Sequence, residues 1–435
     1  NLAPIQAWMF AQSLPEPAHF NQALLLRPQE PLDLKAVEYA LRCVEQHHDA
    51  LRLQFHQREG GWVQSYAETR GEEQDRLTSR AVGDATQITA LANEVHRSFD
   101  LAEAPLWRAV HIQLPDGQER LLLVLHHLLM DGVSWRILLE DLQAAYQACR
   151  QSREALLPAR TSSYQTWAQR LQTEAGRIEQ QQAQWWMEQV SHEGAQLPCA
   201  NPRGRNEISQ QIVAQRHLSP DQTALLLKHA PMANRSQVSE VLLTALARTL
   251  CRLSAQTAVT IQLEGHGRED LFEGVDVSRT LGWFNSLFPV RLVPGLEGEA
   301  GAALLAVQRQ LAAVPDNGLG YGVLRYMGSP EVRKCLHESP QPKVTFNYLG
   351  LFDAGAQDHA LFSSTAEDSG DSVHPQARLV NDLQIVAQVH DGVLSVRCIY
   401  SKRRYRAETV DAMMTLLVSE LHVLIDHCVA VSRLR

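Results

Sequence analysis

Two adjacent histidines, His126 and His127, are followed by Asp131 and Gly132 at the end of an apolar stretch. Imidazole titrates near neutral pH, so such side chains can exchange protons with a bound molecule. One interpretation is that both histidines are hydrogen-bonded core residues and that Asp131 caps a helix, since perturbed polar groups are often structural. The crowding of three polar side chains and a glycine at one strand end favours a functional site instead.

The sequence around these residues predicts the elements that position them. Residues 121–125 are all apolar, which places this strand inside a sheet. The pair Asp116-Gly117 is a hairpin signal that joins the strand to residues 107–114. An amphipathic helix is expected to start near Ser134. We therefore expect a strand, a short loop and a helix, with titratable groups at the strand's end.

The second half of the chain also contains strands and helices. Residues 259–263 alternate apolar and polar side chains, as a strand does, and lead into Glu264. Further predicted elements are a strand over 343–350, a hairpin over 384–400 and a last helix from about residue 408. Strands joined by both hairpins and helices indicate an α+β fold with mixed sheets.

The composition changes between residues 151 and 205, where glutamine and glutamate become frequent and a loop rich in Pro, Gly and Asn follows. We place a domain boundary near residue 175. This gives an N-terminal part over residues 1–175 and a C-terminal part over residues 176–435.

The bulk properties exclude several classes of protein. A net charge of −9 argues against a nucleic-acid partner, although a local basic patch could still bind an acidic protein. The seven cysteines are scattered without CxxC spacing, so we expect free thiols in a reducing cytoplasm and neither a disulfide frame nor a zinc site. No apolar run suggests a membrane span. Neither a glycine-rich phosphate loop nor a metal-ligand cluster is evident, so we expect no dissociable cofactor and no metal. The chain begins at Asn1 rather than Met, so we expect a segment of a longer polypeptide.

Three local expectations concern residues outside the histidine motif. Asp33 is expected to cap a helix, and so is Ser236. His47 and His48 lie on a predicted helix-to-strand turn, and we expect both at the surface.

The spacing His-His-x-x-x-Asp-Gly resembles the core motif of the condensation-domain superfamily of nonribosomal peptide synthetases. Its continuation, residues 133–142, is most similar to the epimerization branch. Four later stretches resemble the same branch, in the expected order: EGHGRE (264–269), SRTLGWFNSLFPV (278–290), NGLGYGVLRY (317–326) and FNYLG with Phe352-Asp353 (346–353). One such motif would be weak, but five in order across the chain are specific.

The resemblance implies an amino-acid epimerase, an isomerase that inverts the α-carbon from L to D in an aminoacyl or peptidyl thioester during nonribosomal peptide synthesis. The substrate would arrive on the phosphopantetheine arm of an upstream peptidyl carrier protein domain, and the enzyme would need no cofactor of its own. An adenylation domain in the same polypeptide and a downstream condensation domain of the next module are the other implied partners. The implied fold is a V-shaped pseudo-dimer of two chloramphenicol-acetyltransferase-like subdomains with a tunnel between them, monomeric as an isolated domain.

Inversion needs a base, an acid on the opposite face of the carbon and stabilisation of an oxyanion. The resemblance assigns the two proton transfers to His127 and Glu264, the latter provided that burial adjusts its pKa. A solvated strand-end carboxylate is the alternative interpretation of Glu264. Asp131 is expected to form a buried, bidentate salt bridge with Arg268 that locks the loop holding His127.

Supporting roles follow from the same resemblance. Asn347 and Tyr348 are expected to line the tunnel, where Tyr348 either bonds the thioester oxygen or is simply a core aromatic residue. His266 is expected to line the site, and His126 to be structural. Three glycines are expected to let the backbone come close to the substrate or to other backbone: Gly132, Gly265 and Gly267.

Other functions remain open at this point. A condensation domain that forms peptide bonds between carrier-bound substrates shares the fold and the histidine motif, but not the Glu264 motif together with the stretches over 317–353. A silent recruitment domain of the superfamily typically lacks the second histidine, which is present here as His127. A small-molecule acyltransferase would leave the cluster around Glu264 unexplained.

Overall fold

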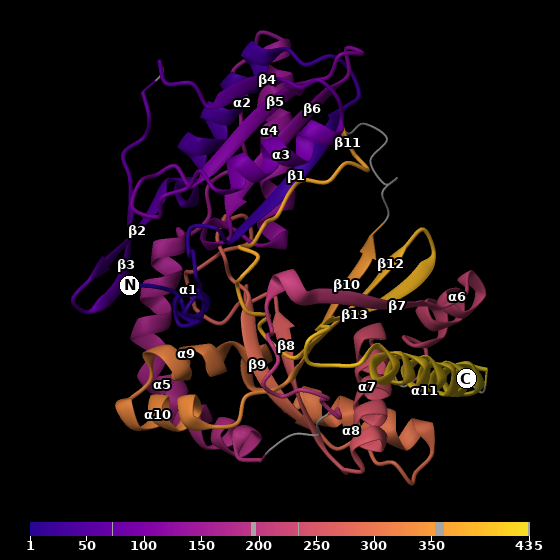
Figure 1. Cartoon of the computed structure of the whole chain (residues 1–435). Helices are drawn as coiled ribbons and strands as arrows, with labels where there is room; N and C mark the ends of the chain where they lie inside the picture. The colour runs from indigo at the N-terminus through magenta and orange to yellow at the C-terminus, as the bar shows by residue number, and fades with distance from the viewer. Residues whose placement is uncertain (72, 193–196, 234, 353–360, 434–435) are drawn as a thin grey trace. The chain divides into compact units, whose positions relative to one another are not determined.

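The computed structural model describes residues 1–71, 73–192, 197–233, 235–352 and 361–433. The chain forms two compact units, each with its own sheet (Figure 1). Unit 1 consists of Asn1–Ala175, His266–Asn285 and Gly355–Ala377. Unit 2 consists of Gly176–Gly265, Ser286–Ala354 and Arg378–Arg435.

This division differs from the expected one in two segments. The first boundary again falls after residue 175, but residues 266–285 and 355–377 return to unit 1 instead of staying with the C-terminal part. The cause is pairing between distant parts of the chain, such as that of β11 (Phe362–Ser364) with β1 (Asn21–Pro28). Local sequence patterns carry no information about such pairings.

The sheet of unit 1 has the strand order β11-β1-β6-β5-β4. Strand β6 lies in its middle, antiparallel to both of its neighbours, and nearly all of its residues are buried. The remaining strands of unit 1 are β2 (Leu53–Arg58), β3 (Gly61–Tyr66), β4 (Leu77–Ala81), β5 (Trp107–Gln113) and β6 (Glu119–His126). Strands β2 and β3 form a separate hairpin.

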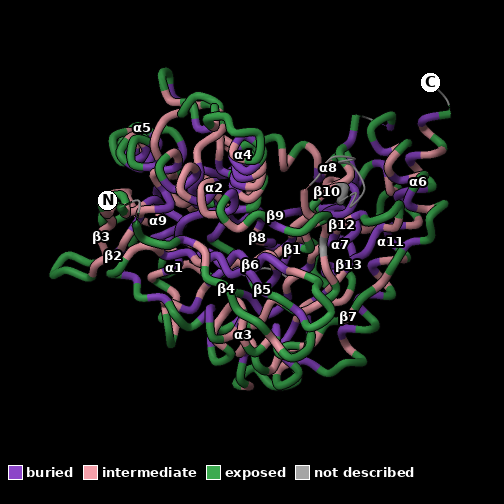
Figure 2. Tube along the Cα trace, turned by 90° about the horizontal axis from the view of Figure 1, so that it is seen from above, coloured by how far each residue is buried: buried purple, intermediate pink, exposed green. Residues whose placement is uncertain are grey.

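Helices cover both faces of this sheet, which is why a strand as apolar as β6 is stable in its centre. Figure 2 shows α2 and α4 on one side of the strands and α3 on the other. The helices and 3₁₀ turns of unit 1 are α1 (Pro4–Phe10), α2 (Leu34–His47), η1 (Asp49–Arg52), α3 (Thr86–His96), η2 (His127–Leu129) and α4 (Gly132–Arg150). Helix α5 (Tyr164–Val190) runs past residue 175, so it belongs to unit 1 at its start and to unit 2 at its end.

The expected strand, loop and helix are present around the histidine motif. Strand β6 ends at His126, one 3₁₀ turn follows, and helix α4 begins at Gly132. The helix begins earlier than expected because Asp131 is its N-cap, accepting a hydrogen bond from the backbone N–H of Ser134 at 2.8 Å. The expected cap at Asp33 is also present, on α2.

The sheet of unit 2 has the strand order β7-β13-β12-β10-β8-β9. Strand β10 runs parallel to β8 and to β12, whereas the other pairs are antiparallel, so the sheet is mixed as expected. Its strands are β7 (Gln211–His217), β8 (Val259–Gly265), β9 (Ser286–Leu292), β10 (Val344–Phe352), β12 (Leu383–His390) and β13 (Val393–Ser401). The predicted hairpin between β12 and β13 turns through Asp391 and Gly392, both with positive φ.

The helices and 3₁₀ turns of unit 2 are η3 (Ile208–Gln210), α6 (Pro220–His229), α7 (Val238–Ser254), α8 (Ala300–Ala312), η4 (Pro315–Gly318), α9 (Leu319–Met327), α10 (Pro330–Glu338) and α11 (Ala407–Ser432). Gln237 caps α7 in place of the expected Ser236, whose hydroxyl donates to the carbonyl of Ala233 instead. Contrary to the sequence-based expectation, α11 is long and apolar enough to cross a membrane by length and composition, with a mean hydropathy of 1.5. Within unit 2 this helix packs against α6, α7 and α8, and a core helix of this kind meets the same criterion.

Candidate active site

His126 is enclosed within unit 1, and both of its ring nitrogens have partners. Nε2 donates to the carbonyl oxygen of Pro17 at 2.8 Å, and Nδ1 accepts from the backbone N–H of Leu128 at 3.1 Å. Burial lowers the pKa of His126 to about 3. A neutral ring with both nitrogens satisfied fits the structural role expected for His126.

His127 has a half-buried ring that stacks on Trp283, with the ring centroids 4.0 Å apart. Nδ1 lies 2.9 Å from the carbonyl oxygen of Met130, and Nε2 lies 3.0 Å from the side-chain nitrogen of Gln22. Burial lowers the pKa of His127, and hydrogen bonds to backbone carbonyls oppose this shift in part. His127 is therefore neutral at physiological pH and able to accept a proton.

The salt bridge expected between Asp131 and Arg268 is confirmed. The side chains are almost fully buried, and the shortest N–O distance is 2.9 Å. The pairing is not bidentate, however, because the single nitrogen Nη2 reaches both oxygens of Asp131, at 2.9 and 3.2 Å. The other terminal nitrogen, Nη1, donates to the carbonyls of Val277 and Thr280 and is not available for Asp131.

This bridge fastens residues 266–285 to the start of helix α4. The second oxygen of Asp131 accepts from the backbone N–H of Phe284 at 3.2 Å, and the Arg268 guanidinium lies 4.1 Å from the centre of the Phe284 ring. Ser134, fully buried, exchanges two hydrogen bonds with the backbone of Gly282. Trp283, which supports the ring of His127, lies between these two anchored residues. The bridge therefore positions His127 through Trp283 as well as through the loop.

Gly267 shows how closely this segment is packed. Its φ is +69°, and a Cβ added there would lie 1.6 Å from the carbonyl oxygen of Phe284. Any side chain at this position would force apart the turn that carries Arg268 and the residues that receive it.

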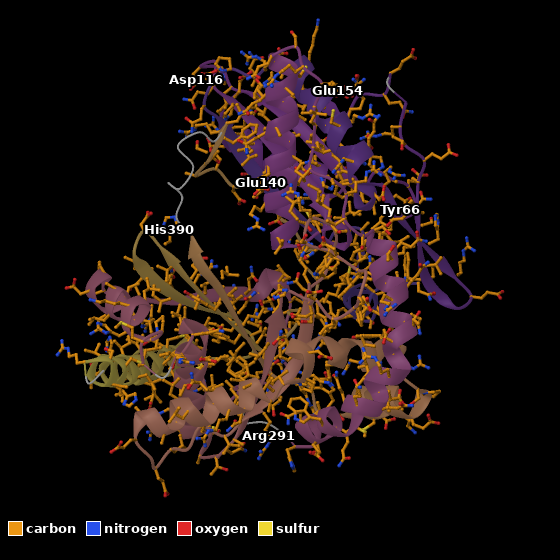
Figure 3. The ribbon with its side chains drawn as sticks, turned by 180° about the vertical axis from the view of Figure 1, so that it is seen from behind. Tyr66, Asp116, Glu140, Glu154, Arg291 and His390 are labelled. Atoms are coloured by element: carbon orange, nitrogen blue, oxygen red, sulfur yellow. The ribbon has the colours of Figure 1, made fainter. Side chains whose placement is uncertain are left out.

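Arg279 provides a second attachment between the same segment and helix α4. It donates to Glu140 at 3.0 Å and to Asp141 at 2.7 Å. Glu140 is exposed on α4 (Figure 3), whereas Asp141 is buried and also contacts Nε2 of His48 at 2.7 Å. The expectation that His48 is a surface residue is therefore wrong, because its ring is needed beside a buried carboxylate; His47 is half-buried.

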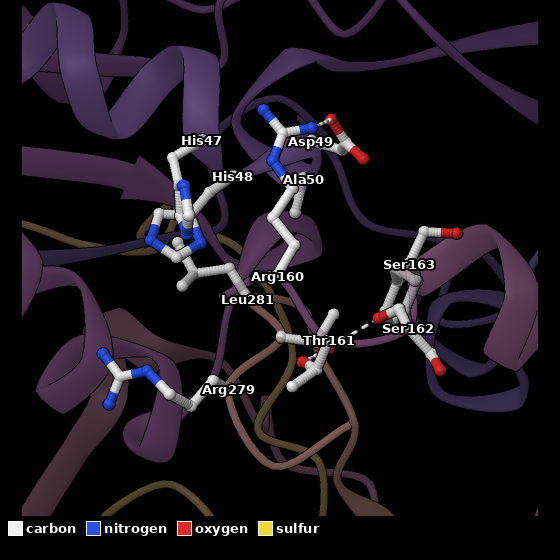
Figure 4. Close-up of a pocket in the computed structure, with 12 residues that line it drawn as sticks. His47, His48, Asp49, Ala50, Arg160, Thr161, Ser162, Ser163, Arg279 and Leu281 are labelled. Carbon is white, nitrogen blue, oxygen red and sulfur yellow. Dashed lines mark hydrogen bonds and ion pairs between the residues drawn. The ribbon is translucent and has the colours of Figure 1, made fainter. Parts of the chain in front are cut away.

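A polar pocket lies beside this network in unit 1 (Figure 4). Its lining residues come from three stretches: 47–50, 160–164 and 279–281. His47, His48 and Asp141 each offer a ligand atom within 4.8 Å of one another, a spacing that a metal ion could bridge. Both oxygens of Asp141 already have partners, and Arg160 and Arg279 line the same pocket, so their charges oppose a cation. We treat the cluster as a structural network.

Glu264 lies at the end of strand β8 in unit 2. The parallel register pairs Leu263 with Phe346, which places Glu264 beside Asn347 on the next strand. The side-chain amide of Asn347 donates to Oε2 of Glu264 at 3.0 Å. Glu264 is exposed, as in the alternative interpretation of a solvated strand-end carboxylate, and lacks the burial on which its assigned role depended. The structure thus brings together two of the expected site residues and orients the carboxylate.

Tyr348 and His266 are placed differently from this pair. Along a strand successive side chains alternate, so Tyr348 lies on the face of Phe346, opposite Asn347. Tyr348 is half-buried, and burial raises the pKa of its hydroxyl. His266 is exposed in unit 1, where Nδ1 accepts from the N–H of Arg268 and Nε2 lies 3.4 Å from Glu269. The described contacts of His266 are thus with residues two and three positions further along the same loop.

The glycines also differ from one another. A Cβ on Gly265 would lie 2.5 Å from Oγ of Ser286 on the neighbouring strand, so close approach does require Gly265. Gly132 is different, since a Cβ there would meet nothing within 4 Å among the described residues. Close packing of the chain against Gly132 is therefore not seen among the described residues, and its expected close approach to a substrate stays a prediction. Asp353, part of the last motif, lies outside the described residues.

Gln22 and Trp283 belong to the site although no sequence pattern marks them as site residues. Gln22 lies on β1 opposite Leu125 of β6, and no local pattern marks it. Trp283 lies within a quoted motif, but only the folded structure shows its ring against His127.

Comparison with known proteins identifies the class. A family model described as the condensation domain matches residues 1–433, and the chain belongs to this family. Its architecture is the chloramphenicol-acetyltransferase-like α+β fold of condensation and epimerization domains, as expected.

Curated relatives are much longer than this chain. Surfactin synthase subunit 1 of Bacillus subtilis (strain 168) is 32% identical over 435 residues, covering 99% of this chain and 12% of the relative. Tyrocidine synthase 1 of Brevibacillus parabrevis is 31% identical over 439 residues, covering 98% of this chain and 40% of the relative. The chain thus spans less than half the length of each.

Solved structures provide two kinds of likeness. The epimerization domain from the third module of tyrocidine synthetase B matches with a TM-score of 0.88 and 31% identity, over 99% of this chain and 97% of that one. The starter condensation domain of rhizomide synthetase RzmA matches with a TM-score of 0.71 and 16% identity, over 98% and 95% of the two chains. The second likeness concerns the fold alone.

Proposed function

We propose that this chain inverts the α-carbon, from L to D, of an aminoacyl or peptidyl thioester carried by a peptidyl carrier protein. The observation that supports this best is the full-length likeness to an epimerization domain, at 31% identity. The condensation domain compared above is only 16% identical.

The site residues fit the chemistry of inversion. Removing a proton from the α-carbon leaves an enolate-like species, and returning a proton to the opposite face completes the inversion. His127 offers a neutral imidazole that can take up a proton on Nε2, and Asn347 orients Glu264. When the neutral imidazole removes the α-proton, Glu264 must start as the carboxylic acid that delivers a proton to the other face, and in the reverse direction its carboxylate accepts while the imidazolium donates. We assign one proton transfer to each. Their protonation states are then exchanged after one turnover and must be reset through solvent.

The alternative is a condensation domain that joins two carrier-bound substrates. The family model itself bears this name, and several structural neighbours are condensation domains. Peptide-bond formation does not require a proton to be delivered to the opposite face of the α-carbon. The condensation reaction therefore assigns no role to Glu264 or to its hydrogen bond with Asn347.

The proposal includes the partners that such a reaction requires. An upstream carrier domain would present the thioester, an adenylation domain in the same polypeptide would load it, and a condensation domain of the next module would consume the D product. The curated relatives are synthases long enough to contain such domains. We further propose a cytoplasmic enzyme that uses no dissociable cofactor or metal.

The test is a stereochemical assay on a loaded carrier. A carrier domain bearing an isotope-labelled L-aminoacyl thioester is incubated with this chain, the thioester is cleaved, and the released amino acid is separated by chirality. A mixture of L and D forms is expected from the wild-type chain and pure L from the carrier alone. Retention of pure L, together with peptide formation when a second loaded carrier is added, would favour the condensation reaction.

A further inference from the structure

A chain of hydrogen bonds runs from the indole of Trp135 through the ring of His127 to a backbone carbonyl. The indole N–H of Trp135, on α4, donates to Oε1 of Gln22 on β1 at 2.8 Å. The side-chain nitrogen of Gln22 lies 3.0 Å from Nε2 of His127, and Nδ1 of His127 lies 2.9 Å from the carbonyl of Met130. All four residues belong to unit 1.

The chemistry of the two ends fixes every proton along this line. A carbonyl can only accept, so Nδ1 of His127 must carry its hydrogen. An indole N–H can only donate, so the amide of Gln22 must direct its oxygen toward Trp135 and its NH₂ group toward His127. The lone pair of Nε2 therefore accepts from Gln22, and the neutral ring has only one tautomer that satisfies all partners.

We propose that Gln22 is a positioning residue for His127: it holds the neutral Nδ1–H tautomer and keeps Nε2 as the proton-accepting atom, while Trp135 fixes the direction of the Gln22 amide. This inference rests on the proposed function for its catalytic meaning. The hydrogen-bond geometry that carries it is independent of the reaction.

The same geometry opposes protonation of the resting ring. An imidazolium would carry N–H groups on both nitrogens, so its Nε2–H would face the NH₂ group of Gln22. Two donors facing each other at 3.0 Å repel, and the amide would have to leave Trp135 to relieve this. Proton uptake by Nε2 thus requires Gln22 to withdraw, which links the charge of the base to the position of this amide.

The surroundings of His127 allow this effect to be isolated. The rings of Phe20 and Trp283 pack on it and do not titrate. The nearby charged group that acts on it is Asp131, which is paired with Arg268. Substituting Gln22 changes neither of these charges.

The test is an NMR titration of the whole chain labelled with ¹⁵N in its histidine rings, with His127 assigned through a His127→Gln variant. In Gln22→Glu a carboxylate replaces the donor, so imidazolium is favoured, and the midpoint of His127 should move upward by about one to three pH units. Trp135→Phe removes only the indole donor and lets the amide rotate, so a smaller upward movement is expected. Gln113→Glu adds the same charge at an exposed position of the same sheet and should leave His127 unchanged.

The outcomes separate this inference from the proposed function. An unchanged His127 titration in both Gln22→Glu and Trp135→Phe would overturn the inference, whatever the activity. If Gln22→Glu fails to fold, an unchanged His127 titration in Trp135→Phe alone would overturn the inference. A moved titration in a chain that never inverts a loaded thioester would uphold the positioning role and refute the epimerase. If both hold, the acid limb of the inversion rate should move upward with the NMR midpoint in each variant.

Discussion

Arg268 reaches both carboxylate oxygens of Asp131 through one nitrogen, Nη2, and uses the other to hold two backbone carbonyls. The side chains are exposed by only 7% and 2%. Removing one member of such a pair leaves the other charged, buried and unpaired, which costs about 3–5 kcal/mol.

Asp131→Ala should therefore lower the free energy of unfolding by about 3–5 kcal/mol, measured by urea denaturation. The matched control is Asp49→Ala, which removes the partner of Arg52 in a more exposed pair of the same unit. A loss of no more than about 1 kcal/mol is expected there. Equal losses in the two variants would mean that burial does not determine how much the Asp131 salt bridge contributes to the free energy of unfolding.

The buried ring of His126 should make stability depend on pH. Its pKa falls to about 3 in the folded chain, whereas an unfolded histidine titrates near 6.5. As the pH falls below 6.5 the unfolded chain binds a proton that the folded chain refuses, so stability declines. When the pH falls from 7.5 to 5.5, this one group should lower the free energy of unfolding by about 1.4 kcal/mol.

The measurement is urea denaturation at both pH values. His126→Gln should lose that share of the pH dependence, while His217→Gln, at an exposed strand end, should keep the wild-type slope. An unchanged slope in His126→Gln would show that the ring is charged in the folded chain or neutral in the unfolded one.

Gly267→Ala should destabilise the chain far more than Gly274→Ala. Both glycines have positive φ and both lie between residues 266 and 285. At Gly274 a Cβ meets nothing within 4 Å, so the cost is the left-handed backbone alone, about 1–2 kcal/mol. At Gly267 the clash with the Phe284 carbonyl is added, and thermal unfolding should show a clearly larger drop in Tm. Similar drops would mean that the turn moves aside at little cost.

Glu264→Gln keeps the shape of the side chain and its contact with Asn347 but removes the carboxyl group that can give or take a proton. If Glu264 transfers a proton, inversion of a loaded thioester should fall by about 10²–10⁴-fold while binding of the carrier persists. Glu273→Gln, at an exposed position nearby in sequence, is the control. Exchange of the α-proton with deuterated solvent adds detail, since exchange from the L form without inversion would assign Glu264 to the opposite face. Normal exchange and inversion would refute its role.

Hydrophobic periodicity was sufficient to predict most of the elements that hold the site. The apolar run before His126, the turn at Asp116-Gly117 and the hairpin at Asp391-Gly392 all form as expected, because their signals are local. Asp131 fulfilled both interpretations at once, since one oxygen caps α4 while both meet Arg268.

Most of the failures involve contacts between residues that are distant in the sequence, and one involves a local competition. His48 resembled a surface residue because its partner Asp141 lies 93 residues away. Gln22 was overlooked because its role depends on the register of β1 against β6. Ser236 had the composition of a cap, but its hydroxyl was used by a preceding carbonyl. Spacing along the chain predicts what a residue could do, whereas its partners are set by pairings that the sequence does not display.

The excursion of residues 266–285 has a consequence for any attempt to divide the protein. Strands β8 and β9 are hydrogen-bonded neighbours in unit 2, yet the chain that joins them is built into unit 1. A fragment ending at residue 175 would lack Arg268, Phe284 and the edge strand β11, and the remainder would carry an unsupported insertion in the middle of a hairpin. Neither fragment coincides with one unit, so an exchange of parts with a related chain should succeed only when both units are transferred together.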